Sequence, residues 1–195
     1  MAITLQLLPS TTTYTLREVA AGNILRPAFG GPLQPLTRKG DHWAVDVTIP
    51  ALDARGCGMG LFADLTRGKR EALVLRVPEY MDARTYGSPV CNSVSTGDTL
   101  SIRGLTPSVV IPKGKWLSLI LNGQRYLYLV AAEAVANGSG VASVQVTSLL
   151  RRPTIDGAVV ELSEPKIEGY VAPNQAADIG TLPAVGLQFS LEERD

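Results

Sequence analysis

The sequence is poor in the residues that most often carry catalytic or metal chemistry. Its 195 residues include one histidine, His42, and two cysteines, Cys57 and Cys91. A secreted disulfide scaffold of this size would carry more cysteines, so we expect both thiols to be reduced and buried. His42 has no cysteine, aspartate or histidine at a ligand spacing, which argues against a zinc site or a Ser-His-Asp triad. We expect His42 to be solvated or to lie at an interface.

Charge is also scarce and has no dominant sign. Charged residues make up 18% of the chain, and 18 Lys and Arg balance 18 Asp and Glu. This balance argues against a basic nucleic-acid binder, which needs a concentrated positive surface. Few charges and a formal charge of zero also give little protection against self-association, which fits a subunit of an assembly.

Long apolar runs are missing. None approaches the roughly 20 residues that a membrane-spanning helix needs. Residues 1–9 lack the basic start of a signal peptide, and polar residues 10–13 follow directly. We therefore expect a protein that is made in a cytoplasm and has no membrane partner.

Short alternating runs bounded by Gly, Pro and Asn dominate the chain, and they predict a mainly β fold. In the first half the clearest run is 42–49, where Trp43, Val45, Val47 and Ile49 share one face. Shorter strands are expected over 2–8, 14–19 and 72–77. Pro50 is expected to end its strand, and a helix is predicted over 51–65 with Asp53 near its positive N-terminal end.

The second half predicts a meander of closely spaced strands, as in a small β-barrel or sandwich. Asn122-Gly123 is a strong two-residue hairpin signal between strands at 116–121 and 126–131. Residues 126–131 are apolar and aromatic enough for a strand that is buried on both faces. Asn137–Gly140 and Asp156-Gly157 predict two further turns.

Two segments suggest how the halves are organised. Residues 187–191 alternate like 43–49, so we expect the last strand to return and pair with that segment. The predicted domains are therefore 1–85 plus 166–195, a β-sandwich with one helix, and 86–165, an inserted small β-barrel. Residues 23–40 are dense in Pro and Gly, which predicts an irregular loop suited to partner contacts. Residues 166–183 show little periodicity.

Several constellations resemble functional sites but have simpler interpretations. Gly56, Gly58 and Gly60 lack dinucleotide-binding spacing and suggest close packing or a loosened helix. Glu161, Glu164 and Glu168 border a turn and are expected to be solvated. Arg151-Arg152 fits either a contact with a neighbouring subunit or a plain surface. Tyr126 and Tyr128 fit a core. We therefore predict no catalytic, cofactor-binding or metal-binding residues and no enzyme activity.

A resemblance to a known family lies in the turns and strands of residues 122–165. Asn122-Gly123 with Arg125-Tyr126, then Ala134–Gly140, Leu149–Arg151, Asp156-Gly157 and Val160–Pro165 resemble a segment shared by minor tail proteins of long non-contractile-tailed bacteriophages. Thr147–Leu150 departs from that pattern, which often has a proline there. In the first half, the Trp43–Ile49 strand and the following helix are similar, as is the closing strand Gly186–Leu191.

The resemblance implies a distal tail protein, a structural virion protein of the tail tip or baseplate hub. Such a protein forms a ring, usually a homohexamer, that joins the tail tube protein to the tail-tip hub protein. The ring leaves a channel through which DNA passes, and a small inserted β-domain of galectin- or OB-like fold decorates its outside, where tail fibres are possible partners. Its location would be the virion tail, after assembly in the cytoplasm of a host bacterium. The family carries no catalytic residues.

Two alternatives remain open at this point. One is another structural subunit of the same tail, a tail tube or tail terminator protein. The other, from a different class, is a carbohydrate-binding module that holds host-surface glycans through Tyr126, Tyr128 or Trp116.

Overall fold

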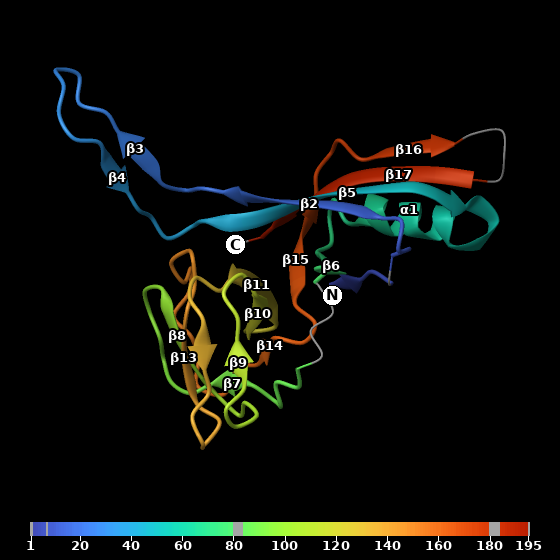
Figure 1. The fold of residues 1–195 in the computed structure, drawn as a ribbon. Helices are drawn as coiled ribbons and strands as arrows, with labels where there is room; N and C mark the ends of the chain where they lie inside the picture. Colours follow the sequence, from blue (N-terminus) through green and yellow to red (C-terminus); the bar gives the residue numbers. More distant parts are fainter. Residues whose placement is uncertain (1, 7, 80–83, 180–183, 195) are drawn as a thin grey trace. The chain divides into compact units, whose positions relative to one another are not determined.

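The computed structural model describes residues 2–6, 8–79, 84–179 and 184–194 (Figure 1). The fold is mainly β, with 45% strand and one 14-residue helix in the described residues, which confirms the fold class expected from the sequence. A main mixed sheet is accompanied by several small sheets.

The chain divides into two compact units, which we describe separately. The first, here called the framework, comprises Met1–Glu18, Trp43–Pro78 and Lys166–Asp195. The second comprises Val19–His42, which includes an arm (residues 20–41), and Glu79–Pro165, which includes a barrel (residues 84–165). That 1–85 plus 166–195 and 86–165 fold as two independent domains stays a prediction.

The framework is built on one seven-stranded sheet with the strand order β1-β6-β15-β17-β5-β2, in which β16 also pairs with β17. Its strands are β1 (Ile3–Thr4), β2 (Thr13–Val19), β5 (His42–Asp53), β6 (Leu73–Arg76), β15 (Lys166–Val171), β16 (Ala176–Ile179) and β17 (Ala184–Glu193). β1 is parallel to β6, whereas β17 is antiparallel to β5, β15 and β16.

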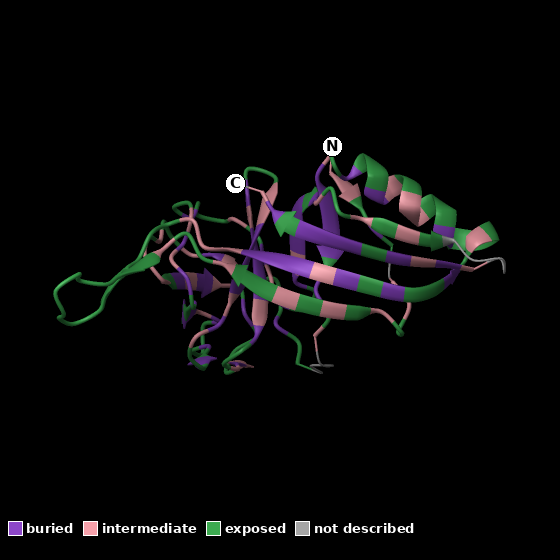
Figure 2. Cartoon of the chain, turned by 90° about the horizontal axis from the view of Figure 1, so that it is seen from above, coloured by how far each residue is buried: buried purple, intermediate pink, exposed green. Residues whose placement is uncertain are grey.

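The last strand returns to the first half of the chain, as predicted. Phe189 of β17 pairs with Val47 of β5, and Leu191 pairs with Val45. More and less buried residues alternate over 45–50 of β5 and 184–189 of β17, whereas three successive residues are buried at 43–45 and at 189–191 (Figure 2). Burying one face of both strands favours this register, because a slip by one residue would turn the apolar face to solvent.

Pro50 does not end its strand, which was the prediction. β5 continues to Asp53, and the pairing shifts between Leu187↔Ile49 and Val185↔Leu52. Pro50 and Ala51 therefore lie opposite Gly186 alone, which is a β-bulge. A bulge tolerates proline because the extra residue donates no ladder hydrogen bond.

The helix begins three residues later than the prediction of 51–65. A π-helical turn, η1 (Ala54–Gly58), leads into α1 (Met59–Arg67). Asp53 precedes them, and its carboxylate accepts a hydrogen bond from the Arg55 backbone N–H at 2.9 Å. The side chain therefore satisfies a backbone N–H that the helix leaves unpaired, as expected from its position.

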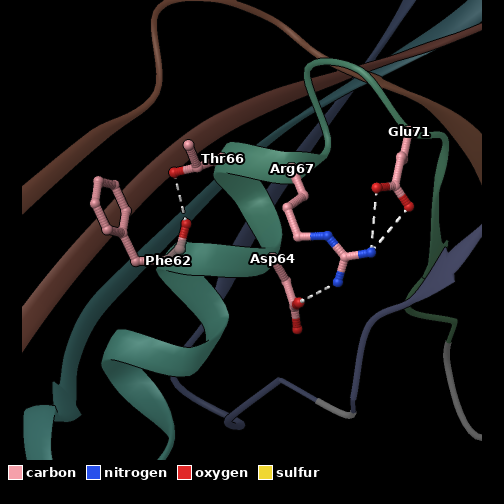
Figure 3. A network of polar contacts seen from close by, with 5 residues as sticks. All are labelled: Phe62, Asp64, Thr66, Arg67 and Glu71. Atoms are coloured by element: carbon pink, nitrogen blue, oxygen red, sulfur yellow. Dashed lines mark hydrogen bonds and ion pairs between the residues drawn. The ribbon is translucent and has the colours of Figure 1, made fainter.

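The end of α1 is held by contacts within its last turns and with Glu71, which follows the helix (Figure 3). The Thr66 hydroxyl donates to the Phe62 carbonyl at 2.9 Å, and the Arg67 guanidinium lies 3.0 Å from Glu71 and 3.9 Å from Asp64. These exposed ion pairs each contribute only tenths of a kcal/mol, roughly 0.3–0.5, so helix stability depends mainly on packing. Leu65 is the fully buried residue of α1.

Residues 166–183 show little periodicity in the sequence, yet they include β15, which lies between β6 and β17 in the sheet. Its alternation is hidden because a charged residue and a glycine occupy buried positions. Glu168 is 0% exposed and pairs with Arg194 at 2.6 Å. Gly169 lies so close to the backbone of β17 that no side chain would fit there.

The barrel contains β7 (Val90–Cys91), β8 (Thr99–Arg103), β9 (Val110–Ile111), β10 (Trp116–Leu121), β11 (Gln124–Leu129), β12 (Ala134–Val135), β13 (Ala142–Gln145) and β14 (Val160–Glu161). Asn122 and Gly123, between β10 and β11, both have positive φ, 51° and 80°. Leu121 pairs with Gln124 across them. The predicted two-residue hairpin is confirmed, because two positive φ values are what such a turn requires.

Two isolated bridges close the barrel ladder. β13-β8-β7 and β11-β10-β14 are separate sheets, but Val90 bridges to Val159 and Val130 bridges to Val146. These bridges join β7 to the β14 end and β11 to the β13 end, so that the ladder returns to its start. The enclosed core includes Leu117, Tyr128 and Val144, all 0% exposed.

Candidate binding surfaces

The first candidate surface is the arm, where the prediction of an irregular loop is wrong. β3 (Asn23–Leu25) and β4 (Gln34–Leu36) form an antiparallel ribbon that follows on from β2 and leads into β5 (Figure 1). Pro35, paired with Ile24, is compatible with this ribbon because a two-stranded ribbon leaves outward positions that need no N–H donor.

The base of the ribbon is fixed by local contacts. The Ala21 backbone N–H donates to the Asp41 carboxylate at 2.7 Å. A Cβ on Gly22 would lie 2.5 Å from the Leu36 carbonyl oxygen, so only glycine lets the two backbones approach this closely. The conformation of the arm is therefore encoded in the sequence.

The arm exposes large apolar side chains. Phe29 at its turn is fully exposed, and Leu33 and Ile24 are 58% and 53% exposed. Residues 22–40 carry Arg26, Arg38 and Lys39 and no acidic residue. An isolated two-stranded ribbon is marginally stable in water, and a cluster of exposed apolar side chains marks an interaction surface. The arm is thus suited to a partner that is apolar and has acidic groups at its margin.

The second candidate surface is a groove on the barrel, with a volume of about 640 Å³. One wall is the β10–β11 hairpin, which contributes Leu121, Asn122, Gln124 and Tyr126. The other wall is formed by Val94 and by Arg152, Pro153, Thr154 and Ile155. We call this surface the barrel groove.

Hydrogen bonds of the buried residue Thr154 and of Arg151 hold the second wall in place. The Thr154 hydroxyl accepts from the Ser95 N–H at 2.6 Å and donates to the Ser93 carbonyl at 2.7 Å. One residue before the wall begins, the Arg151 N–H donates to the Tyr128 hydroxyl at 3.1 Å. The wall is therefore positioned by the barrel core in the absence of any ligand.

The groove is electrostatically positive, since its lining has Arg152 and no acidic residue. Next to Arg152 in the sequence, the Arg151 guanidinium lies 4.8 Å from the centre of the Tyr126 ring, within the range of a cation–π interaction. The nearby carboxylate of Glu161 accepts from Ser118 at 2.7 Å and pairs with Arg125 at 3.0 Å, so its charge is compensated locally.

Two of the three aromatic residues considered for glycan contact are not available as a platform. Tyr128 is fully buried and Tyr126 is 5% exposed, which confirms the interpretation of both as core residues. Trp116 is half-buried. A sugar ring stacks on an exposed aromatic face, so the placement of such contacts on Tyr126 and Tyr128 is wrong.

The three glutamates have different environments. Glu164 is exposed, as expected, whereas Glu161 is half-buried and Glu168 is fully buried, so the expectation of solvation is wrong for these two. Glu168 belongs to the framework and Glu161 to the barrel. Each has its own arginine partner, which explains why burial is tolerated.

The two cysteines also differ. Both are free thiols, but Cys91 is buried and Cys57 is exposed, so burial is confirmed for the first and wrong for the second. Burial, followed by the charge of Asp156, raises the pKa of Cys91 to about 11. Cys57 lines a second cavity of about 300 Å³ in the framework, together with Leu8, Leu52 and Leu61.

The remaining predicted positions show structural contacts. His42 is half-buried, and its Nδ1 lies 2.8 Å from the Gly40 carbonyl oxygen. Gly56 has non-helical backbone angles, and a Cβ on Gly58 would lie 3.0 Å from the Asp53 carbonyl oxygen. This confirms a loosened helix at Gly56 and close packing at Gly58. In the described part of the chain, no group of three or more His, Cys, Asp or Glu could hold a metal ion, and no helix is long and apolar enough to cross a membrane.

Sequence reasoning did not find the barrel groove. Its two walls are distant in sequence, and the closed ladder brings them together. The available signals were the Asn122-Gly123 turn and the Arg-Arg-Pro run at 151–153, but neither indicated that the other lay nearby.

Comparison with known proteins does not assign a family. No protein-family model matches the sequence, and a search of curated proteins gives no match. We therefore infer function from the arm, the barrel groove and the strand topology.

Proposed function

We propose that this chain is a structural protein of a bacteriophage tail, a distal tail protein that assembles into a ring. The ring, with six copies as its expected size, would join the tail tube protein to the tail-tip hub protein and leave a channel for DNA. The inserted barrel would decorate the ring, where tail fibres are possible partners. This proposal extends the resemblance in the turns and strands of residues 122–165.

The observation that carries the proposal is the arm. It is a formed ribbon whose base is fixed by the Asp41 hydrogen bond, yet its apolar side chains at Ile24, Phe29 and Leu33 are exposed. Covering these side chains would stabilise the arm, at about 25 cal/mol per Å² of apolar surface removed from water. The low charge of the chain does not oppose association.

The arm favours a ring over a symmetric dimer if it binds a different surface of the next copy. Such a contact is heterologous, and it closes into a ring when the rotation between copies divides a full turn. In this arrangement every arm is covered and every docking surface is filled.

The test is the assembly state of the purified chain. Light scattering coupled to size-exclusion chromatography and negative-stain electron microscopy should show a closed ring for the natural sequence. The double variant F29S/L33S should shift the protein to monomer, because it removes the apolar contacts and leaves the ribbon backbone intact. The control is V135S, which changes an exposed apolar residue of the barrel and should leave the ring unchanged.

A strictly monomeric protein at high concentration, with no virion association, would contradict the proposal. The same images address the nearest alternative, because a tail tube subunit would stack into many identical rings. A single ring or a pair of rings agrees with the distal tail assignment.

A further inference from the structure

We propose that the exposed turn of the arm docks into the framework cavity of the next copy of the chain. The arm turn is residues 26–33, which join β3 to β4 and carry Phe29 and Leu33. The framework cavity is the hollow of about 300 Å³ whose lining includes Cys57. This inference rests on the proposed ring, and it names the surface that each arm would fill.

The framework cavity lies within one compact unit, where the segment between β1 and β2 meets the start of the helix. Leu8, Leu52 and Leu61 make its lining mainly apolar. Gly60 also belongs to the lining, and the space beside it is open, because a Cβ there would meet no atom within 4 Å. The cavity therefore exposes apolar surface to water until a partner covers it.

The arm turn has the size that this cavity requires. Phe29 is fully exposed and Leu33 is 58% exposed. A cavity of roughly 150 Å³ holds a benzene molecule. The framework cavity, at about 300 Å³, therefore has space for the Phe29 ring and for one aliphatic side chain, which Leu33 supplies. Docking would remove the apolar surface of both partners from water at the same time.

The charges select the framework cavity over the barrel groove. Residues 22–40 carry three basic residues and no acidic one, and Arg26 lies in the turn itself. The groove lining has Arg152 and no acidic residue, so it would repel the arm. The lining described for the framework cavity has Asp64 and no basic residue. Asp64 is 43% exposed, and its contact with Arg67 is long at 3.9 Å, so its carboxylate is accessible to Arg26 of the next copy.

The two docking partners are different surfaces of the chain. The arm belongs to one compact unit and the framework cavity to the other. A contact between them is heterologous, which is the condition for closing a ring by rotation. Each copy offers one turn and one framework cavity, so a closed ring leaves neither of them open.

The first test links the two surfaces covalently in the full-length chain. A28C places a thiol beside Phe29, and a short bismaleimide joins it to the natural Cys57 when the arm occupies the cavity. We expect denaturing gels to show a ladder of crosslinked species up to the size of the ring. The ladder should be lost in A28C/C57A. V135C, which places the thiol on the exposed surface of the barrel, should give no ladder.

The second test fills the cavity from within its own copy. G60F adds an aromatic ring at a position whose surroundings are open, so the chain should fold with the cavity occupied. We expect light scattering to show a shift from ring to monomer. The matched control is M59F, which introduces the same side chain at an exposed position of α1 outside the lining and should keep the ring. Thermal unfolding checks that G60F is folded, and the crosslink does not depend on this variant.

The outcomes separate this inference from the proposed function. A natural chain that stays monomeric overturns the ring and the docking together. A ring that gives no crosslink in A28C, or that persists in folded G60F, overturns the docking alone. A crosslink confined to single chains also overturns the docking, because each arm would then fill its own cavity. A ladder that ends at a dimer supports the docking and contradicts the ring.

Discussion

Gly169 occupies the tightest position between two neighbouring strands of the framework. A Cβ at this position would overlap the Glu192 carbonyl oxygen of β17, so β15 and β17 would have to separate. We expect G169A to lower the free energy of unfolding by about 2–3 kcal/mol, as forced overpacking does. Urea denaturation followed by circular dichroism measures this change.

The matched control is another glycine with open space around it. A Cβ on Gly60, inside α1, would meet no atom within 4 Å. G60A should therefore raise stability by up to about 1 kcal/mol through helix propensity alone. Equal effects of the two substitutions would show that the close approach at β15 has no energetic consequence.

The two thiols should react differently. At neutral pH a thiol reagent should label Cys57 in the folded protein and both cysteines after unfolding, because Cys91 is buried. Since burial raises the pKa of Cys91 from 9.0 to about 11, the folded state disfavours its thiolate. The neutral Cys91 thiol therefore gives its full contribution to folding stability below pH 9, and this contribution is lost as the pH rises towards 11.

Denaturant titrations across this pH range test the effect, with C91A as the comparison. The natural sequence should lose more stability than C91A between the two values. Parallel curves for the two proteins would contradict the assignment.

At the scale of elements, the β10–β11 hairpin depends on residues that tolerate positive φ. Asn122 has φ 51°, a conformation that costs most other residues about 1–2 kcal/mol. We expect N122A to destabilise the barrel by about 1 kcal/mol, whereas N122G should be nearly neutral. Thermal unfolding of both variants gives the comparison, and an equal loss in both would indicate that the Asn122 side chain matters more than its backbone.

This hairpin was predictable because its determinants lie next to one another in the sequence. The same holds for the alternating strand around Val45 and for the Asp53 cap. The prediction that Pro50 ends its strand was wrong because the bulge opposite Gly186 depends on β17, which is far away in sequence. β15 was not predicted because it buries the charged residue Glu168. The partner that stabilises this charge, Arg194, lies too far away in sequence to be part of a local pattern.

The two candidate surfaces also differ in how far they could be predicted from the sequence. The arm was expected as a contact segment, and its exposed apolar side chains agree with that interpretation, although the ribbon itself was not expected. The groove required the two walls to meet across the barrel. Periodicity within one strand carries no information about such a meeting.

At the scale of the whole molecule, the inserted segment begins and ends at neighbouring positions of one sheet. Arg76 of β6 pairs with Lys166 of β15 in an antiparallel register. Without the insertion these two strands would form an ordinary hairpin. We therefore expect the framework to fold when residues 77–165 are replaced by Asn-Gly, a two-residue turn that joins antiparallel strands and here would be flanked by the paired residues Arg76 and Lys166.

Far-UV circular dichroism and a single cooperative unfolding transition would show the fold, and a nuclear Overhauser contact between Arg76 and Lys166 would show the register. The control joins the same ends by Val-Val, which resists the positive φ values of the turn and should be less stable. An unfolded product with both linkers would mean that the framework depends on the inserted segment.

The closed ladder of the barrel also bears on aggregation. Unpaired strand edges template the growth of cross-β fibrils, and a ladder that returns to its starting strand offers them no row of free amides. The two-stranded ribbon around Ile24 and Phe29 does offer such a row, beside exposed apolar side chains. If the protein precipitates on storage without its partner copies, the first intermolecular strands should therefore form at this ribbon. A soluble peptide that pairs with the edge of the ribbon should delay the precipitation.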